Sequence, residues 1–585
     1  MKSIAFIACM LLSIGASAEQ FGDFRYGVVG SNIQIYVYTG LGGDVVIPEE
    51  IEGMPVATID RDAFANVTNL TSVIIPTNVT AIFDHAFSGC TGLRTVSLSA
   101  NLDVLYDGVF TQCTGLTNIT VSPDNSVLSS SNGILYDKTG TILIQFPCGI
   151  GNSVSIPEGV THIGPSAFSG DVALTNIIFP ESLGSIGGSS FALCDGLVNV
   201  FIPARVSNIS AGAFANCGAL TAFEVSGSNA CYSTSHGILL DYPGTTLVQY
   251  PAGLTGSYDI PDAITNISPS AFSGCAGLTA VNISTHVSSI GSYAFSGCTG
   301  LADIAVPNNI LTIANGIFNV CTGLTNVFLP AGITDIGSGA FYGCNSLENI
   351  NIPDSVTRLA WGAFQYCSAL TNIVLGTGIA TIESRVFYEC NNLRNISIPA
   401  SVTNLWNAAF DYCHGLTNIT VSAENPVYRS INGVIFNKSH SSLLHFPGGF
   451  EGHYAVPDGV QSIGDYAFDP SLNLTCVELP ASITYLGRYA FSHCTNLTGL
   501  CFNGSPPKLG TQTFLFSSNV VMYYRTANAA DWGTTFADLP TAIWPEFFTV
   551  EIQPAGFACE VVASDGQEVV IETCPDLSSG EWTPV

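Results

Sequence analysis

The amino-acid sequence predicts an α/β solenoid with a parallel β-sheet on one face, short helical or 3₁₀ turns on the other, and three β-hairpin inserts. Three observations lead to this fold class. The pattern Ala-Phe-x-x-Cys-x-x-Leu recurs every 23 residues, each copy contains a short strand motif, and three insertions of equal length interrupt the series. A fixed period of this kind is typical of arrays in which each unit buries its apolar face on its neighbours.

The repeat reads as one turn followed by one strand. Phe341, Cys344 and Leu347 are three residues apart, so they share one side of a short helical or 3₁₀ turn. Ile350 and Ile352 are two residues apart, which is the spacing of a strand. The aligned phenylalanines are Phe64, Phe87, Phe110, Phe168, Phe191, Phe214, Phe272, Phe295, Phe318, Phe341, Phe364, Phe387, Phe410, Phe468, Phe491 and Phe514.

The ends of the chain differ from the array. Lys2, the apolar run from Ile4 to Ile14 and the small residues Ala16 to Ala18 predict a signal peptide over residues 1–18, cleaved near Ala18. We expect an N-terminal β cap over 19–59, because the first repeat would otherwise expose a strand edge. The solenoid is expected over 60–545, and a short or truncated C-terminal β segment over 546–585.

Three inserts of 35 residues lie near 121–156, 225–260 and 421–456. Each contains two short apolar runs around a polar turn, which predicts a β-hairpin. Two interpretations stay open: the hairpin enlarges a repeat and packs onto it, or it shapes a binding surface.

Cysteine occupies the same slot in twelve repeats. Adjacent repeats bring such residues within disulfide range, but equivalent side chains on stacked repeats point the same way, and Val67, Asp171 and Ser471 fill the slot without sulfur. We therefore expect buried free thiols. Cys559 and Cys574 lie outside the array and are candidates for a disulfide. The slot cysteines are Cys90, Cys113, Cys194, Cys217, Cys275, Cys298, Cys321, Cys344, Cys367, Cys390, Cys413 and Cys494.

These motifs resemble the BspA-like leucine-rich-repeat family, whose unit has 23 residues. The resemblance rests on the strand Leu-x-x-Ile-x-Ile-Pro at 347–353 and 393–399, the Val-Thr-x-Ile-Gly run and the Ala-Phe-x-x-Cys turn, and it covers about residues 23 to 545. It implies a secreted or cell-surface protein of bacteria that contacts host or neighbouring-cell molecules.

Composition and motifs argue against several other functions. The chain has 14 Lys and Arg against 44 Asp and Glu, a net charge of −30, which disfavours nucleic acid and anionic membranes as partners. No later apolar run is long enough to span a bilayer. No hydrolase, phosphate-loop, zinc-protease or C-x-x-C motif is present, so we expect no catalytic residues, no metal site and no cofactor.

The second and fourth residues after the first Leu of each strand should point away from the core. The second is often Asn, whereas the fourth varies, as suits a scaffold that presents a readable face. The candidate ligand-binding residues at these outward positions are Phe201, Glu224, Asn282, Phe328, Asn351 and Val374. We expect a non-catalytic module that binds an unknown protein or glycan; the alternative is a structural cell-envelope or matrix protein with homotypic contacts.

Overall fold

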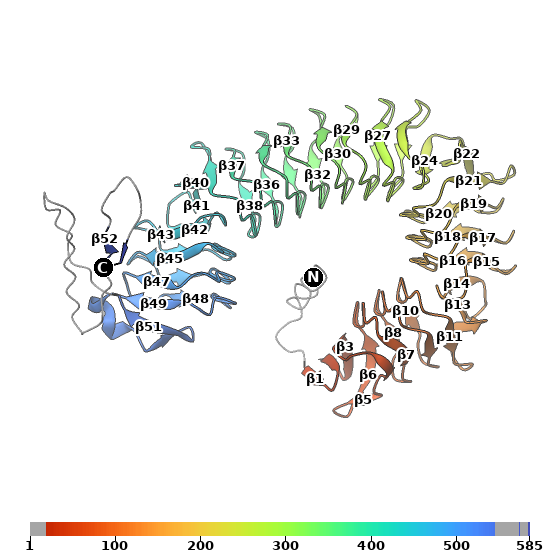
Figure 1. The fold of residues 1–585 in the computed structure, drawn as a ribbon, viewed down its shortest axis with the longest axis horizontal. Helices are drawn as coiled ribbons and strands as arrows, with labels where there is room; N and C mark the ends of the chain where they lie inside the picture. Colours follow the sequence, from red (N-terminus) through yellow and green to blue (C-terminus); the bar gives the residue numbers. More distant parts are fainter. Residues whose placement is uncertain (1–18, 545–571, 574–582, 585) are drawn as a thin grey trace. The chain divides into compact units, whose positions relative to one another are not determined.

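A computed structural model describes residues 19–544, 572–573 and 583–584 (Figure 1). The chain divides into two compact units, one extending to Gly378 and the other beginning at Ile379, and each is described by itself. Almost all regular structure in the described residues is β-strand, the exception being the 3₁₀ helix η1 (Thr526–Asp531). The predicted signal peptide lies outside the described residues, as do Cys559 and Cys574.

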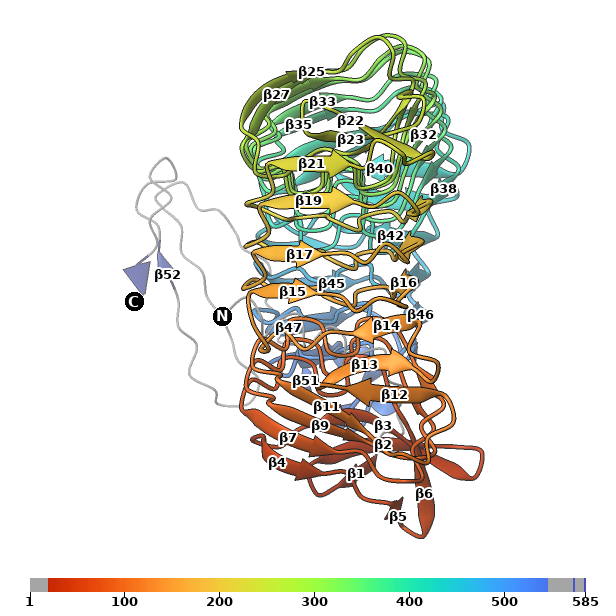
Figure 2. The ribbon, with the colours of Figure 1, turned by 90° about the vertical axis from the view of Figure 1, so that its right-hand side faces the viewer.

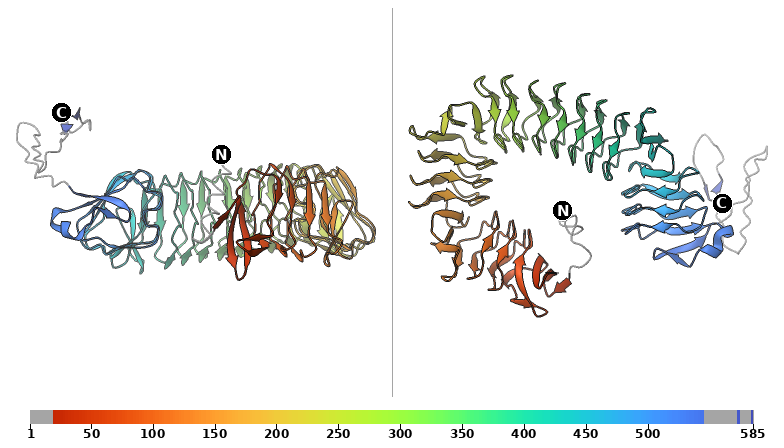
Figure 3. Two further views of the ribbon diagram at one scale, coloured as in Figure 1. Left: turned by 90° about the horizontal axis from the view of Figure 1, so that it is seen from below. Right: turned by 180° about the vertical axis from the view of Figure 1, so that it is seen from behind.

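The first unit begins with six cap strands. The strands β1, β2 and β3 pair antiparallel, and β3 then pairs parallel with β6, which carries the backbone into the repeat direction. The cap is the red end of the ribbon in Figure 3. Tyr26, Ile33 and Ile35 are buried against the first repeats and close that end of the core. The cap strands are β1 (Glu19–Phe21), β2 (Phe24–Val29), β3 (Asn32–Tyr38), β4 (Gly43–Val46), β5 (Glu50–Ile51) and β6 (Met54–Ile59).

Each repeat forms one rung with two strands, a longer one on one side and a two-residue one on the other (Figure 2). Each strand pairs in parallel with the equivalent strand of a neighbouring rung. In unit 1 the longer strands are β7 (Leu70–Ile74), β9 (Thr95–Leu98), β11 (Asn118–Val121), β15 (Ser153–Ser155), β17 (Asn176–Ile178), β19 (Asn199–Ile202), β21 (Ala222–Val225), β25 (Gly256–Asp259), β27 (Leu278–Asn282), β29 (Asp303–Ala305), β31 (Asn326–Phe328), β33 (Asn349–Asn351) and β35 (Asn372–Val374). The short strands are β8 (Ala81–Ile82), β10 (Val104–Leu105), β16 (His162–Ile163), β18 (Ser185–Ile186), β20 (Asn208–Ile209), β26 (Asn266–Ile267), β28 (Ser289–Ile290), β30 (Thr312–Ile313), β32 (Asp335–Ile336) and β34 (Arg358–Leu359).

Equivalent residues meet across neighbouring rungs. In β33 and β35, for example, Asn349 aligns with Asn372 and Ile350 with Ile373. The two isoleucines are buried and the two asparagines exposed, as the two-residue period of a strand requires. The 23-residue period therefore produces columns of like residues along each unit.

The predicted helical or 3₁₀ turn around each phenylalanine is not confirmed, and the α/β class is replaced by a β-solenoid. The segment Asp60–Val67 consists of successive hydrogen-bonded turns, and Asp62 and Asn66 have positive φ of 57° and 60°. Left-handed residues on both sides of Phe64 stop any helix from propagating. The freed amides bond between rungs instead; the Phe64 amide donates to the carbonyl of Ala86 at 2.7 Å.

The repeat phenylalanines form a buried stack along the core. Ring centroids of consecutive rungs are 4.8 Å apart for Phe272 and Phe295 and 5.4 Å apart for Phe318 and Phe341, with nearly parallel planes. These rings are fully buried. Such stacking adds aromatic contact energy to a large apolar burial, so each ring joins two rungs.

The slot cysteines are buried free thiols, as the sequence predicted. They also have a role that the sequence did not suggest, because the thiol of Cys344 donates to the carbonyl of Phe318, 3.2 Å away on the preceding rung. Ser517 occupies the slot of the final rung, and its hydroxyl donates to the carbonyl of Phe491 at 2.6 Å. The slot therefore selects a small donor that satisfies the carbonyl of the stacked phenylalanine.

Each insert of unit 1 adds three strands. The strands β12 and β13 pair antiparallel, β13 pairs antiparallel with β14, and β14 returns to the parallel array by pairing with β16. The second insert repeats this order with β22, β23, β24 and β26. The insert strands are β12 (Leu128–Ser131), β13 (Ile134–Asp137), β14 (Ile142–Gln145), β22 (Tyr232–Ser235), β23 (Ile238–Asp241) and β24 (Thr246–Gln249).

A buried asparagine fixes the entry to each insert. The side-chain amide of Asn125 donates to the carbonyls of Ser99 and Leu102, both at 2.9 Å, and its oxygen accepts from the amides of Val127 and Leu128. Asn229 and Asn425 make the same four kinds of bond in the other two inserts. Because all hydrogen-bonding atoms of the amide are used, the inserts are anchored in a defined position.

Unit 2 continues the same architecture from residue 379. The third insert comprises β40, β41 and β42, and the longer strands end in the parallel series β43, β45, β47, β49 and β51. Its strands are β36 (Thr381–Ile382), β37 (Asn395–Ile398), β38 (Asn404–Leu405), β39 (Asn418–Val421), β40 (Tyr428–Ile431), β41 (Val434–Asn437), β42 (Ser442–His445), β43 (Gly452–Ala455), β44 (Ser462–Ile463), β45 (Leu474–Leu479), β46 (Tyr485–Leu486), β47 (Gly499–Phe502), β48 (Lys508–Leu509), β49 (Val521–Tyr524), β50 (Thr535–Phe536) and β51 (Leu539–Ile543). In the predicted C-terminal segment, the described residues form the antiparallel pair β52 (Glu572–Thr573) and β53 (Thr583–Pro584).

Candidate functional site

The outward side chains of the longer strands of unit 1 form the candidate binding face. All six candidate residues lie on it and are exposed: Phe201, Glu224, Asn282, Phe328, Asn351 and Val374. The core side of the same strands holds the buried Val200, Ile304 and Ile350. Strand alternation thus separates packing from presentation within three residues.

The strand register determines which candidates are neighbours. Phe201 on β19 aligns with Glu224 on β21, and Asn351 on β33 aligns with Val374 on β35. Phe328 on β31 aligns with Ala305 on β29, so a small side chain leaves one side of its ring open. Asn282 on β27 aligns with Asp259 on β25. Phe328, Asn351 and Val374 occupy the same column on three consecutive rungs, so the six residues extend along the unit and do not form one compact cluster.

Large apolar groups are exposed on this face. Phe201 retains 48% of its accessible surface, Phe328 64% and Val374 52%. Ile74 and Ile178 occupy the same variable column and are also exposed. They are further apolar residues of this face that are not among the six candidates. Exposed aromatic groups on a regular polar surface are typical anchors of recognition.

Polar side chains of the second column bond to one another along the face. The amide nitrogen of Asn326 donates to a carboxylate oxygen of Asp303 at 2.6 Å, and that of Asn176 donates to the hydroxyl of Ser153 at 3.0 Å. These bonds connect side chains one rung apart and hold them in fixed rotamers. A preordered polar column reduces the entropy lost when a ligand binds.

The turns on the other side of the rungs carry further exposed aromatics that the sequence analysis did not identify. Tyr106, Tyr293 and Trp361 in unit 1 and Trp406 in unit 2 keep more than two fifths of their surface accessible. Tyr106 stacks on Phe83 of the preceding rung, with ring centroids 4.9 Å apart. These residues lie just after the short strands, where the 23-residue consensus has no aromatic residue. An aromatic residue at such a position is the sequence signal that could have identified them.

Two equivalent cavities lie where unit 1 is interrupted. The first, about 170 Å³, lies between Leu105–Val109, β14 and Gly164–Pro165; the second, about 140 Å³, lies between Ile209–Ala213, β24 and Ser268–Pro269. The insert rung has a short Phe-Pro or Tyr-Pro segment in place of the full turn. The missing turn leaves space beside its neighbours, so the cavities are a geometric result of the insertion.

A histidine of unit 2 lies within hydrogen-bonding distance of a largely buried carboxylate. In unit 2, the Nδ1 atom of His493 lies 3.0 Å from a carboxylate oxygen of Asp469 and 2.8 Å from the hydroxyl of Ser492. Burial raises the pKa of Asp469. The same nitrogen of His493 faces both the carboxylate and the hydroxyl, and its contact with Asp469 links two neighbouring rungs.

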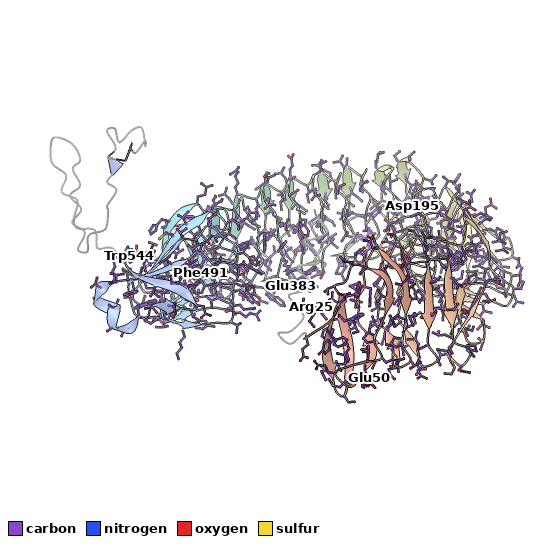
Figure 4. The ribbon with its side chains drawn as sticks, turned by 60° about the horizontal axis from the view of Figure 1, so that its bottom comes forward. Arg25, Glu50, Asp195, Glu383, Phe491 and Trp544 are labelled. Atoms are coloured by element: carbon purple, nitrogen blue, oxygen red, sulfur yellow. The ribbon has the colours of Figure 1, made fainter. Side chains whose placement is uncertain are left out.

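Residues 19–544 contain no group of three or more His, Cys, Asp or Glu side chains arranged to hold a metal ion. In the part of the chain that the structure describes, no helix combines the length and apolar character needed to cross a membrane. Figure 4 shows how the side chains of unit 1 that it labels, Arg25, Glu50 and Asp195, are spread along the unit.

Three solved structures illustrate what this chain is similar to. A leucine rich cell surface protein from Faecalibacterium prausnitzii is 29% identical over 62% of this chain and 95% of its own, with a TM-score of 0.38. A leucine-rich repeat protein from Eubacterium ventriosum is 20% identical, covering 72% and 99% of the two chains with a TM-score of 0.43. A leucine-rich repeat protein from Bacteroides ovatus is 19% identical, covering 90% and 99% with a TM-score of 0.28. Among curated proteins, none matches the sequence.

The family model described as "BspA type Leucine rich repeat region (6 copies)" matches residues 44–148, 144–236, 253–370, 334–452 and 452–530. These ranges include the rungs of both units, with their phenylalanine stack and cysteine slot, and they cover well over half of the chain. The chain therefore belongs to the BspA-type leucine-rich-repeat family.

Proposed function

We propose that this protein is a secreted or cell-surface binding module without catalytic activity, which recognises a protein or glycan through the outward strand face of unit 1. The observation that supports it most is the exposure of Phe201 and Phe328 on a face whose other outward residues are mostly polar. The family membership favours a binding or adhesion role. Export would follow cleavage of residues 1–18 near Ala18.

The mechanism would be multivalent. Many weak polar contacts along the asparagine column would position the ligand, and the exposed aromatics would supply the apolar anchors. Sugars and peptides both suit such a face, because each offers apolar patches and hydroxyl or amide groups at short intervals. The acidic balance of the chain favours neutral or basic ligands over polyanions.

The experiment compares four variants of the chain against a panel of surface proteins and glycans from host and neighbouring cells. For any ligand that the wild-type chain binds, Phe201→Ala and Phe328→Ala should each weaken binding about tenfold or more, as truncation of an anchor does. Phe516→Ala removes an equally exposed phenylalanine of unit 2 and serves as the matched control.

Tyr242→Ala tests the alternative that the inserts carry the ligand, because Tyr242 is exposed next to β23 of the second insert. Loss of binding in this variant alone would move the site to the insert. Unchanged binding by both Phe201→Ala and Phe328→Ala would reject the proposed face. Concentration-dependent self-association, with no foreign ligand bound, would instead favour the homotypic structural role.

A further inference from the structure

Two cysteines outside the repeat slot lie side by side on the outward face of unit 2. Cys476 is on β45 and Cys501 on β47, neighbouring parallel strands in the terminal sheet of the unit. Their neighbours Val477 and Leu500 point into the core, so the two thiols are on the opposite face. This end of the sheet leads to β51 and to Trp544, which Figure 4 labels.

The geometry brings the two sulfur atoms together. Their Sγ atoms are 3.7 Å apart, although the residues are diagonal in the register: Cys476 aligns with Gly499, and Glu478 aligns with Cys501. Gly499 has no side chain, and a Cβ built there would lie 3.4 Å from the sulfur of Cys476. That distance is an ordinary van der Waals contact, so the sulfur of Cys476 lies beside the backbone of Gly499 and close to the sulfur of Cys501.

The slot cysteines are arranged differently. Cys494 occupies the slot of the same repeat that contains Cys501. It is fully buried, and its thiol donates to the carbonyl of Phe468 at 3.3 Å. Burial raises the pKa of that thiol to about 12, which keeps it protonated and unreactive. The reactivity of the outward pair can therefore be compared with that of a buried slot thiol in the same protein.

The two outward thiols are chemically unequal. Cys476 is partly exposed, whereas Cys501 is only 5% accessible. A hydrogen bond from Cys501 lowers the pKa of Cys476, and the same bond raises the pKa of Cys501. Cys476 is therefore the accessible thiol that more readily forms a thiolate, and Cys501 is the protected thiol beside it.

Charged groups partly enclose the pair. The carboxylate of Glu478 accepts from the amide of Asn503 at 2.8 Å and lies 3.9 Å from a guanidinium nitrogen of Arg525. Arg525 also lies over the ring of Trp544, 3.9 Å from its centroid. These contacts order the residues around Cys501 and limit access to its sulfur from solvent.

We propose that Cys476 and Cys501 are a reversible disulfide site, formed by exchange with a small-molecule disulfide. The Cys476 thiolate attacks one sulfur of the oxidant and releases one thiolate, leaving a mixed disulfide on Cys476. Cys501 then loses its proton, attacks the Cys476 sulfur and releases the second thiol. Two protein thiols are oxidised to one disulfide, and one small disulfide is reduced to two thiols.

Bond formation requires a local movement. The sulfur atoms must approach from 3.7 Å to about 2 Å, and diagonal strand positions start further apart than most bridged cysteines. A bond that pulls two strands together stores strain, and strained disulfides are more easily reduced. The site is therefore expected to respond to the ratio of disulfide to thiol, not to remain permanently oxidised.

The test uses the full chain, first reduced and then equilibrated with oxidised and reduced glutathione at several ratios. Free thiols are blocked with a maleimide under denaturing conditions, and the chain is digested with trypsin without reduction. Cleavage at Lys438, Arg488 and Lys508 places Cys476 in peptide 439–488 and Cys501 in peptide 489–508. Cys494 shares the second peptide, so it is the control for site selectivity within the same spectrum.

We expect the two peptides to be joined through Cys476 and Cys501, with the mass of two hydrogen atoms lost and Cys494 carrying the maleimide. Cys501→Ser should stop at the glutathione adduct of Cys476, whereas in Cys476→Ser the adduct on Cys501 should form at least tenfold more slowly. Separate peptides with both thiols blocked at every glutathione ratio would overturn the proposal, as would a link through Cys494.

Discussion

The uninterrupted rungs from Phe272 to Phe364 and the first insert show two ways of continuing the same core. In the uninterrupted rungs, every phenylalanine stacks on the next, and the slot cysteine donates to the carbonyl of the preceding ring. In the insert, Phe146 takes the place of a repeat phenylalanine and stacks on Phe168 at 4.7 Å. The insert thus provides a ring for the rungs that follow it, although it lacks the full turn.

The insert satisfies the ring carbonyl with a different donor. The side chain of Gln145 donates to the carbonyls of Phe146 and Ala167, both at 3.1 Å, so the carbonyl of Phe146 has a donor without the slot residue. That residue is Asp171, which is fully buried and whose two carboxyl oxygens have no hydrogen-bond partner among the described residues. The difference teaches that the carbonyl of the stacked ring can take its donor from the insert, and that a carboxyl in the slot is then buried without compensation; the second insert, where Gln249 bonds the carbonyl of Tyr250, keeps Cys275 in the slot.

The largest effect is expected where the stack is removed. Phe318→Ala should destabilise unit 1 by about 3–5 kcal/mol, because it leaves a cavity between two rings and removes a large buried side chain. Phe328→Ala, on the outward face of the next strand, is the control and should change stability by less than about 0.5 kcal/mol. Chemical denaturation followed by circular dichroism measures both, and equal effects would show that the stack does not carry the core.

Asp171→Cys should stabilise the protein at neutral pH and make its stability less dependent on pH. Burial raises the pKa of the Asp171 carboxyl from 3.8 to about 7, a difference that corresponds to about 4 kcal/mol at most. Between these values the folded chain retains a proton that the unfolded chain has released, so stability falls as the pH rises from about 4 to about 7.

The measurement is the free energy of unfolding of both chains at several pH values in that window. Their difference should be small near pH 4 and should grow towards pH 7. A constant difference across the window would mean that the Asp171 carboxyl does not titrate as its burial requires, and would remove the contrast drawn between the two regions.

The smallest of these effects concerns the slot thiol in the regular rungs. Cys344→Val keeps a small apolar side chain but leaves the Phe318 carbonyl without its donor, which should cost about 1–3 kcal/mol. Cys344→Ser keeps a donor, as Ser517 does at the final rung, and should cost less than the valine variant. The reverse order of stability would show that the slot selects for apolar volume alone.

Much of this architecture could be predicted from the repeat. The period placed Phe341, Cys344 and Ile350 in the core and Asn351 outside, because stacking in parallel register repeats each environment every 23 residues. The prediction of a helical turn was wrong because a three-residue spacing suits a helical turn and a series of β-turns equally. The pattern also does not reveal that Asp62 and Asn66 have positive φ. The exposed Ile178 and Trp361 depart from the consensus, so periodicity could not assign them a role.

The sequence by itself determined the rung, its core residues and the outward columns, since these follow from local spacing and from the need of each unit to bury its apolar face on the next. The tertiary structure alone decided how the turns bond between rungs, that Gln145 donates to the carbonyl of Ala167 on the next rung, and that Cys476 meets Cys501 across two neighbouring strands. These contacts join residues more than 20 positions apart through strand register and backbone conformation, which a local pattern does not record.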